Sequence, residues 1–239
     1  MMPAKPTIRW AVVCLLSLQA FACLGQTPSA LEVADAVNTF RAARERKIIE
    51  DFIAFLALPN VASSLPDMQA NAQHITALLE PRGFTVQTLR SGGAPYVFAE
   101  LSTPGARETV LIYAHFDGQP VQTENWTYAP FTPTLLNGLI QEGGEPIELN
   151  SVADQFNPEW RIYARSAGDD KMPVIALIHM LDALRANGLE LTVNLKLLLD
   201  GEEERGSPTL GQVIDDNPGL FDADLLLSLI HISEPTRPT

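Results

Sequence analysis

Leu195–Pro208 reads LKLLLDGEEERGSP, and this stretch decides both the fold and the chemistry that the sequence predicts. An apolar run that ends abruptly at Asp200-Gly201 is typical of a buried strand. Glu202, Glu203 and Glu204 then follow side by side, although like charges repel and a buried carboxylate is costly unless a cation neutralises it. The stretch therefore predicts either a solvated acidic turn or a cation site at the end of a strand.

The bulk composition predicts one sizeable domain of an acidic protein. The chain has 239 residues, of which 46% are hydrophobic, and a formal net charge of −13. This charge argues against nucleic acid or an anionic membrane as a partner. The only cysteines are Cys14 and Cys23, so no disulfide is expected beyond the N-terminal segment.

The first residues have the layout of an export signal. Lys5 and Arg9 precede an apolar run that is too short for a membrane span, and Ala20-Phe21-Ala22 offers a cleavage site. We expect residues 1–25 to be a signal peptide and the product to be periplasmic or secreted, with no integral membrane span after its removal. Lipid attachment at Cys23 and a buried first helix are the alternatives.

The last residues have an unusual origin in this interpretation. LSLIHISEPTR, from Leu227 to Arg237, is what a transposase adapter used in sequencing libraries encodes. We therefore expect residues 227–239 to be a non-native tail, residues 26–226 to be a partial catalytic domain, and His231 to have no catalytic role.

Between these ends, apolar periodicity and Gly/Pro breaks predict helices alternating with strands. We expect helices over residues 29–58, 66–79 and 173–186. We expect strands over residues 84–89, 96–101, 109–114, 162–164 and 191–199, with another beginning at Asp224. Residues 135–160 should leave the sheet as a long excursion. This alternation predicts an α/β fold with a mixed, mostly parallel sheet flanked by helices on both faces.

Three polar clusters lie at or just after predicted strand ends, where ligands gather in α/β sheets. The clusters are His115 with Asp117, Asp169 with Asp170, and Glu202 to Glu204. Each also has an ordinary interpretation: a surface turn, acidic capping of a helix N-terminus, and a solvated acidic loop. Consecutive residues of an extended chain point in opposite directions, so Glu203 and Glu204 are expected to do different jobs.

A pair of zinc ions explains all three clusters at once. Zinc accepts histidine nitrogen and carboxylate oxygen, and two-metal hydrolases hold their ions about 3.5–4 Å apart on a shared ligand. Magnesium or calcium sites would not need the histidine. His74 and His179, inside predicted helices, are expected to be ordinary helix residues rather than ligands.

Four stretches then resemble a known family: HFDGQPVQ from His115, WTYAPFTPTL from Trp126, ARSAGDDK from Ala164 and DGEEERGSP from Asp200. Their order and spacing resemble the co-catalytic zinc hydrolases of peptidase family M20, which include carnosinase-type dipeptidases, aminoacylases and carboxypeptidase G. The resemblance implies a hydrolase that uses metal-activated water on small peptides or N-acyl amino acids.

The resemblance also implies a role for each candidate residue. His115 would bind one of two zinc ions, and Asp117 would orient the histidine. Asp169 would bridge both ions through a carboxylate that precedes a cis peptide bond. Counting back from the following Gly-Ser, Glu203 would be the general base and Glu204 a zinc ligand.

The sequence departs from the family pattern in several respects. Ser166 and Met172 stand where glycines are common, and the excursion over residues 135–160 is long. A second-zinc aspartate, a distal histidine and the lid domain through which such proteins can dimerise are expected beyond residue 226. We therefore expect the sequence as written to be inactive and truncated before the lid domain. The alternative is a non-catalytic metal-binding α/β domain, which would have no reason to keep Glu203.

Overall fold

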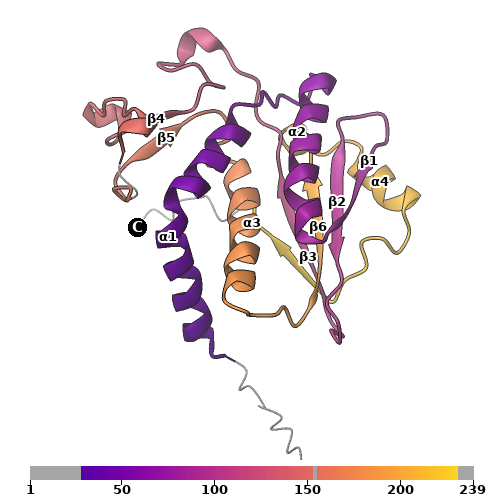
Figure 1. Cartoon of the computed structure of the whole chain (residues 1–239). Coiled ribbons are helices and arrows are strands. Elements are labelled where there is room, and N and C mark those ends of the chain that lie inside the picture. The colour runs from indigo at the N-terminus through magenta and orange to yellow at the C-terminus, as the bar shows by residue number, and fades with distance from the viewer. Residues whose placement is uncertain (1–27, 153–154, 231–239) are drawn as a thin grey trace, which may run out of the picture.

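The structure is a computed structural model that describes residues 28–152 and 155–230. Its centre is a five-stranded sheet in the order β1-β2-β6-β3-β7, covered by helices (Figure 1). The sheet strands are β1 (Thr85–Leu89), β2 (Tyr96–Leu101), β3 (Thr109–His115), β6 (Asn194–Asp200) and β7 (Leu225–Ser228). The predicted signal peptide and most of the predicted non-native tail lie outside the described residues.

The predicted mixed α/β sheet is confirmed, but the expectation that most of its strand pairs are parallel is wrong. β3 pairs in parallel with β6 and β7, whereas β1 with β2 and β2 with β6 are antiparallel. Only residues 90–95 join β1 to β2, and a connection this short allows a hairpin but not the crossover that parallel strands require.

Three helices lie where the sequence predicts them, within a few residues: α1 (Ala30–Leu56), α2 (Leu65–Leu79) and α3 (Lys171–Ala186). A fourth helix, α4 (Leu210–Asp216), was not predicted. A capping box starts α1, because Glu32 N–H donates to Ser29 Oγ at 3.3 Å and Ser29 N–H donates to the Glu32 carboxylate at 2.7 Å. Among the described helices, none has the length and apolarity that crossing a membrane requires.

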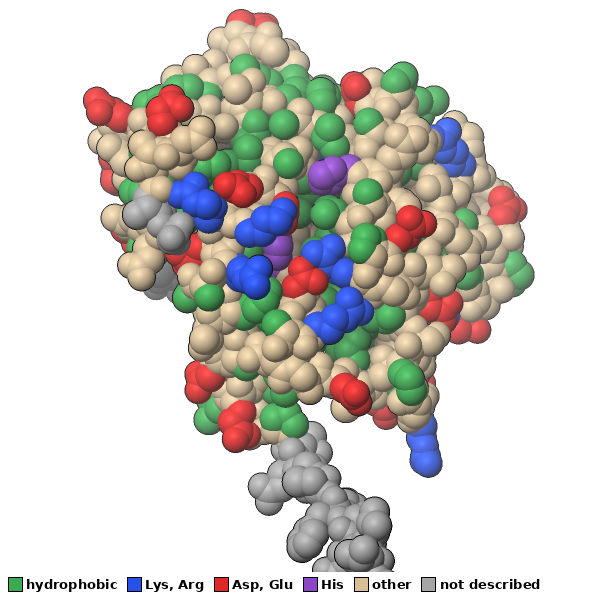
Figure 2. Space-filling view, viewed as in Figure 1, with side chains coloured by type: hydrophobic (Ala, Val, Ile, Leu, Met, Phe, Trp, Pro, Cys, Tyr) green, Lys and Arg blue, Asp and Glu red, His purple; other side chains and the backbone are tan. Residues whose placement is uncertain are grey.

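Both faces of the sheet are covered, but unequally. The larger core lies between the sheet and α1, α2 and α3, where α2 packs on β1 and β2 and α1 packs on α3 (Figure 1). A smaller cluster on the other face joins Tyr96, Leu111 and Leu198 to Val213 of α4. Acidic and basic side chains are interspersed on the face shown in Figure 2. Ion pairs such as Arg41 with Glu45 lie along α1.

The parallel register of β3 and β6 positions the candidate site. His115 at the end of β3 lies opposite Asp200 at the end of β6, and Phe116 N–H donates to Asp200 O at 2.8 Å. The loops that follow the two strands therefore start side by side at the carboxyl edge of the sheet. This is the edge at which the sequence predicts a ligand site.

Two further regions complete the fold. The predicted excursion over residues 135–160 runs from β4 (Thr134–Leu136) to β5 (Arg161–Tyr163), which pair as a separate two-stranded sheet, with 3-10 turns between them at Ile140–Glu142 and Leu149–Ser151. β7 is an edge strand whose leucines Leu225, Leu226 and Leu227 are 44–62% exposed. Leu227 and Ser228, which open the predicted non-native tail, pair with Ile112 and Tyr113 of β3.

Candidate metal centre at the sheet edge

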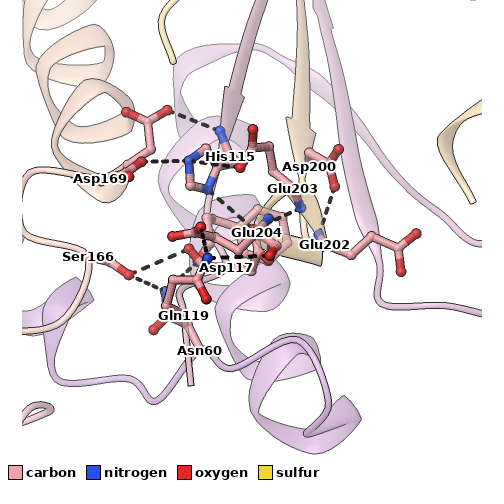
Figure 3. Close-up of polar contacts among 12 residues, drawn as sticks. Asn60, His115, Asp117, Gln119, Ser166, Asp169, Asp200, Glu202, Glu203 and Glu204 are labelled. Carbon is pink, nitrogen blue, oxygen red and sulfur yellow. Dashed lines mark hydrogen bonds and ion pairs between the residues drawn. The ribbon is translucent and has the colours of Figure 1, made fainter. Parts of the chain in front are cut away.

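The His115 imidazole lies at the centre of the candidate site, where its two ring nitrogens face different carboxylates (Figure 3). Nε2 lies 2.8 Å from Asp169 Oδ1 and 3.7 Å from Glu203 Oε2. Nδ1 lies 3.3 Å from Asp117 Oδ1. Burial favours the neutral ring, but the carboxylates of Asp117, Asp170 and Glu203 outweigh it and raise the pKa of His115 to about 9. The site therefore attracts positive charge.

Asp117 is held by the turn that carries the glutamates. Its carboxylate is fully buried, and it accepts hydrogen bonds from the backbone N–H of Glu203 at 3.1 Å and of Glu204 at 3.2 Å. These bonds place one of its oxygens against the Nδ1 side of His115. A carboxylate in this place fixes the ring orientation and leaves Nε2 for another partner.

Asp169 and Asp170, at the start of α3, have different hydrogen-bond partners. The Asp169 carboxylate contacts His115 Nε2 and is 64% exposed. The Asp169–Asp170 peptide bond is cis, as the resemblance implies. Asp170 occupies the N-cap position of α3, but its side chain makes no capping hydrogen bond and instead accepts from the His115 backbone N–H at 3.2 Å. The capping interpretation of this pair is therefore wrong, because the carboxylate turns to the strand end.

The glutamate run forms a 3-10 turn over Glu203–Arg205 rather than the extended chain expected. The expectation that neighbouring glutamates point differently still holds. Glu203 faces His115, whereas the Glu204 carboxylate accepts from Gln119 Nε2 at 2.6 Å. Burial raises the pKa of Glu204 and the charge of Asp169 adds to this rise, although the Gln119 hydrogen bond opposes it. Glu204 is thus within electrostatic reach of Asp169.

The donor set fits a divalent cation such as zinc. An imidazole nitrogen and carboxylate oxygens are the ligands that zinc accepts, and Nε2 of His115 already faces the carboxylates of Asp169 and Glu203. Both carboxylates are partly exposed, at 64% and 29%, so a cation can reach them from solvent. Within the described ranges, no three His, Cys, Asp or Glu side chains form a complete ligand group. The carboxylate of Glu204, the third predicted ligand, accepts a hydrogen bond from Gln119 Nε2.

The roles of several residues near the site were not predicted from the sequence. Asn60 Nδ2 donates to Phe116 O at 2.7 Å and to Ser166 Oγ at 2.9 Å, which ties three loops together. Asp200 and Glu202 belong to the predicted acidic stretch, but no separate role was predicted for them, and both are buried. Their hydrogen-bond partners include Tyr113 of β3 and Tyr96 of β2, which lie far away in the sequence. His74 and His179 lie in α2 and α3, where His74 stacks on Phe55 and His179 faces Asp51 at 3.3 Å.

Comparisons with known proteins identify the family. A model of peptidase family M20/M25/M40 matches residues 111–239. The β-Ala-His dipeptidase of Rattus norvegicus is 32% identical over 121 residues, which are 50% of this chain and 20% of that protein. The Cys-Gly metallodipeptidase DUG1 of Candida albicans is 28% identical over 186 residues, which are 70% of this chain and 34% of that protein.

Solved structures share the fold. The M20 family metallo-carboxypeptidase Sso-CP2 of Sulfolobus solfataricus is 29% identical with a TM-score of 0.59, over 76% of this chain and 36% of that one. Human carnosine dipeptidase 1 is 20% identical with a TM-score of 0.64, over 82% of this chain and 40% of that one. The chain spans between 20% and 34% of the length of the two curated relatives named above. Because the family model matches more than half of the 239 residues, the chain belongs to peptidase family M20/M25/M40.

Proposed function

We propose that this chain is part of the catalytic domain of a zinc-dependent hydrolase that cleaves peptide or amide bonds of small substrates such as dipeptides. The observation that carries the proposal is the meeting of His115 Nε2 with the carboxylates of Asp169 and Glu203 at one sheet edge. Membership of the peptidase family and the dipeptidase names of the relatives support the reaction class. N-acyl amino acids are the second substrate class in this proposal.

In this proposal His115, Asp169 and Glu204 would hold the metal, with Asp169 shared between two zinc ions in the whole protein. When bound, zinc would lower the pKa of water towards roughly 7 and polarise the scissile carbonyl. Asp117 keeps the imidazole in the orientation that presents Nε2 to the metal side.

Glu203 would be the general base. Its carboxylate lies on the open side of His115, at 3.7 Å from Nε2, and it is 29% exposed. From there it would accept a proton from the attacking water and pass that proton to the leaving amine. Glu204 points to Gln119 instead, so the two neighbours are available for different tasks.

The proposed activity is tested on β-Ala-His, Cys-Gly and an N-acetyl amino acid as substrates. The longest form of the protein that its gene encodes would be stripped with a chelator and assayed with and without added zinc. We expect hydrolysis of at least one substrate, appearing only when zinc is restored. Tight zinc binding without hydrolysis of any of the three would favour the non-catalytic metal-binding domain instead.

Asp117→Asn is expected to weaken zinc binding by about 10–100-fold, the usual cost of losing a carboxylate behind a metal-binding histidine. The amide nitrogen of asparagine would face the backbone N–H of Glu203 or Glu204, both donors to Asp117. Calorimetric zinc titration measures the effect, with Asp67→Asn in the first turn of α2 as the matched control. Zinc affinity equal to that of the control would contradict an orienting role for Asp117.

A further inference from the structure

Glu202 is the one glutamate of the run that turns away from the candidate metal centre. Its side chain is buried, and its carboxylate accepts four hydrogen bonds. Tyr96 Oη donates to Oε1 at 2.8 Å, Thr209 N–H donates to Oε1 at 2.9 Å, and Ala94 N–H donates to Oε2 at 3.2 Å. The Thr209 hydroxyl is the fourth donor. The carboxylate is thus fully satisfied within the protein and is unavailable as a ligand.

The backbone of Glu202 closes the turn that presents Glu203 and Glu204. Glu202 O accepts from Arg205 N–H and from Ser207 N–H, each at 3.1 Å, and Glu202 N–H donates to Asp200 Oδ1 at 2.7 Å. The same residue therefore anchors its side chain on the start of β2 and its main chain in the 3-10 turn. Rotation of the turn would break both sets of bonds.

Two glycines make this anchoring possible. A Cβ at Gly93 would lie 2.2 Å from Glu202 Oε2, and a Cβ at Gly201 would lie 2.2 Å from Pro95 O. No real side chain tolerates such distances without displacement of its neighbour. The loop over residues 90–95 and the turn after β6 are therefore interlocked at van der Waals contact.

We propose that Glu202 is a positioning residue that locks the turn so that Glu203 faces His115 and Glu204 faces the Gln119 side of the site. It touches no reacting atom and acts through the two glutamates that follow it. This inference rests on the proposed function, because it assigns Glu202 a part in organising the same metal centre. It also explains why three glutamates stand in a row: two serve the site and the first holds them.

The test perturbs the anchor from both sides. Glu202→Ala removes the carboxylate, and Gly93→Ala pushes on it without changing the turn itself. Both are expected to weaken zinc binding by about 10–100-fold, as other supporting residues of metal sites do. Glu202→Gln keeps an oxygen for Tyr96 and Thr209 but turns its amide nitrogen towards the Ala94 N–H, so its zinc affinity should lie between those of Glu202→Ala and the parent protein.

Hydrogen exchange at the turn distinguishes a loss of positioning from a general loss of stability. Hydrogen exchange at the Glu203 and Glu204 amides should accelerate in Glu202→Ala and Gly93→Ala at temperatures where the rest of the sheet stays protected. Asp182→Asn, near the C-terminal end of α3, is the control, since it removes the negative charge that pairs with Arg82 and should lower stability without changing zinc affinity.

Zinc affinity and turn exchange that match the parent protein in both Glu202→Ala and Gly93→Ala would overturn the inference. If Glu202→Ala does not fold, Gly93→Ala and Glu202→Gln still decide it. A parent protein that binds no zinc would refute the proposed function, and the exchange of the turn amides would then test the interlock alone.

Discussion

Glu203→Gln is expected to lower kcat/KM for dipeptide hydrolysis by about 10²–10⁴-fold, while zinc affinity stays within about twofold of that of the parent protein. The substitution keeps the size of the side chain and removes the group that can accept a proton. Glu203 lies 3.7 Å from His115 Nε2 and is partly exposed, so its carboxylate is placed to reach a water in the site. The loss should fall mainly on kcat, because substrate binding does not need the proton acceptor.

Two further variants sharpen this prediction. Glu204→Gln should reduce zinc affinity, since Glu204 is a proposed ligand, and its hydrolysis should recover at higher zinc concentration. Glu80→Gln, at an exposed position after α2, should leave both properties unchanged. Rates for Glu203→Gln equal to those of the parent protein would end the assignment of Glu203 as the general base. Recovery of Glu203→Gln by excess zinc would make it a ligand instead.

Most of the elements that build this site could be predicted from the sequence because each has a strong local signal. The leucine run of β6 ends at Asp200, Ser29 caps α1, and Asn187-Gly188 closes α3. The positions of His115 at the end of a strand and of the glutamate run just after one follow from the same patterns. Local apolar periodicity and turn residues determine such boundaries almost alone.

The order and direction of the strands could not be predicted in this way. β2 lies between β1 and β6, and its antiparallel pairing with β6 joins residues that are far apart in sequence. Nothing in the sequence of either strand indicates whether its neighbour runs parallel or antiparallel to it. Register and order are settled by which arrangement buries the leucines of β6 against α2 and α3, which is a property of the whole chain.

Which carboxylate faces which partner could not be predicted from the sequence either. Asp170 and Glu202 look like their neighbours Asp169 and Glu203, yet Asp170 turns to the His115 backbone and Glu202 turns to Tyr96 and Thr209. A run of identical residues predicts that carboxylates are needed at this edge. Which of them faces solvent depends on donors supplied by distant segments, so the structure is required to tell them apart.

Lys171→Met is expected to destabilise the fold by about 2–5 kcal/mol, the largest effect on stability that we predict for a single substitution. Lys171, the first residue of α3, is fully buried, and its Nζ donates to Phe55 O at 2.8 Å and to Leu58 O at 2.9 Å. These carbonyls lie at the C-terminal end of α1, where a cation is favoured by the helix dipole. The ammonium also lies 4.5 Å from the centre of the Phe55 ring.

Methionine keeps the length of the lysine stem but leaves both carbonyls without their donor. Each unpaired buried carbonyl costs about 1–3 kcal/mol. Removal of the buried cation offsets only part of the combined cost of the two carbonyls. Chemical denaturation of the metal-free protein measures the change, with Lys47→Met as the matched control. Lys47 is 62% exposed and pairs with Asp51 on the surface of α1, so its loss should cost less than about 0.5 kcal/mol. A change below about 1 kcal/mol in Lys171→Met would contradict the anchoring role, because water would then have to satisfy both carbonyls. A large change would instead establish that the residue next to Asp169 and Asp170 ties the start of α3 to the end of α1.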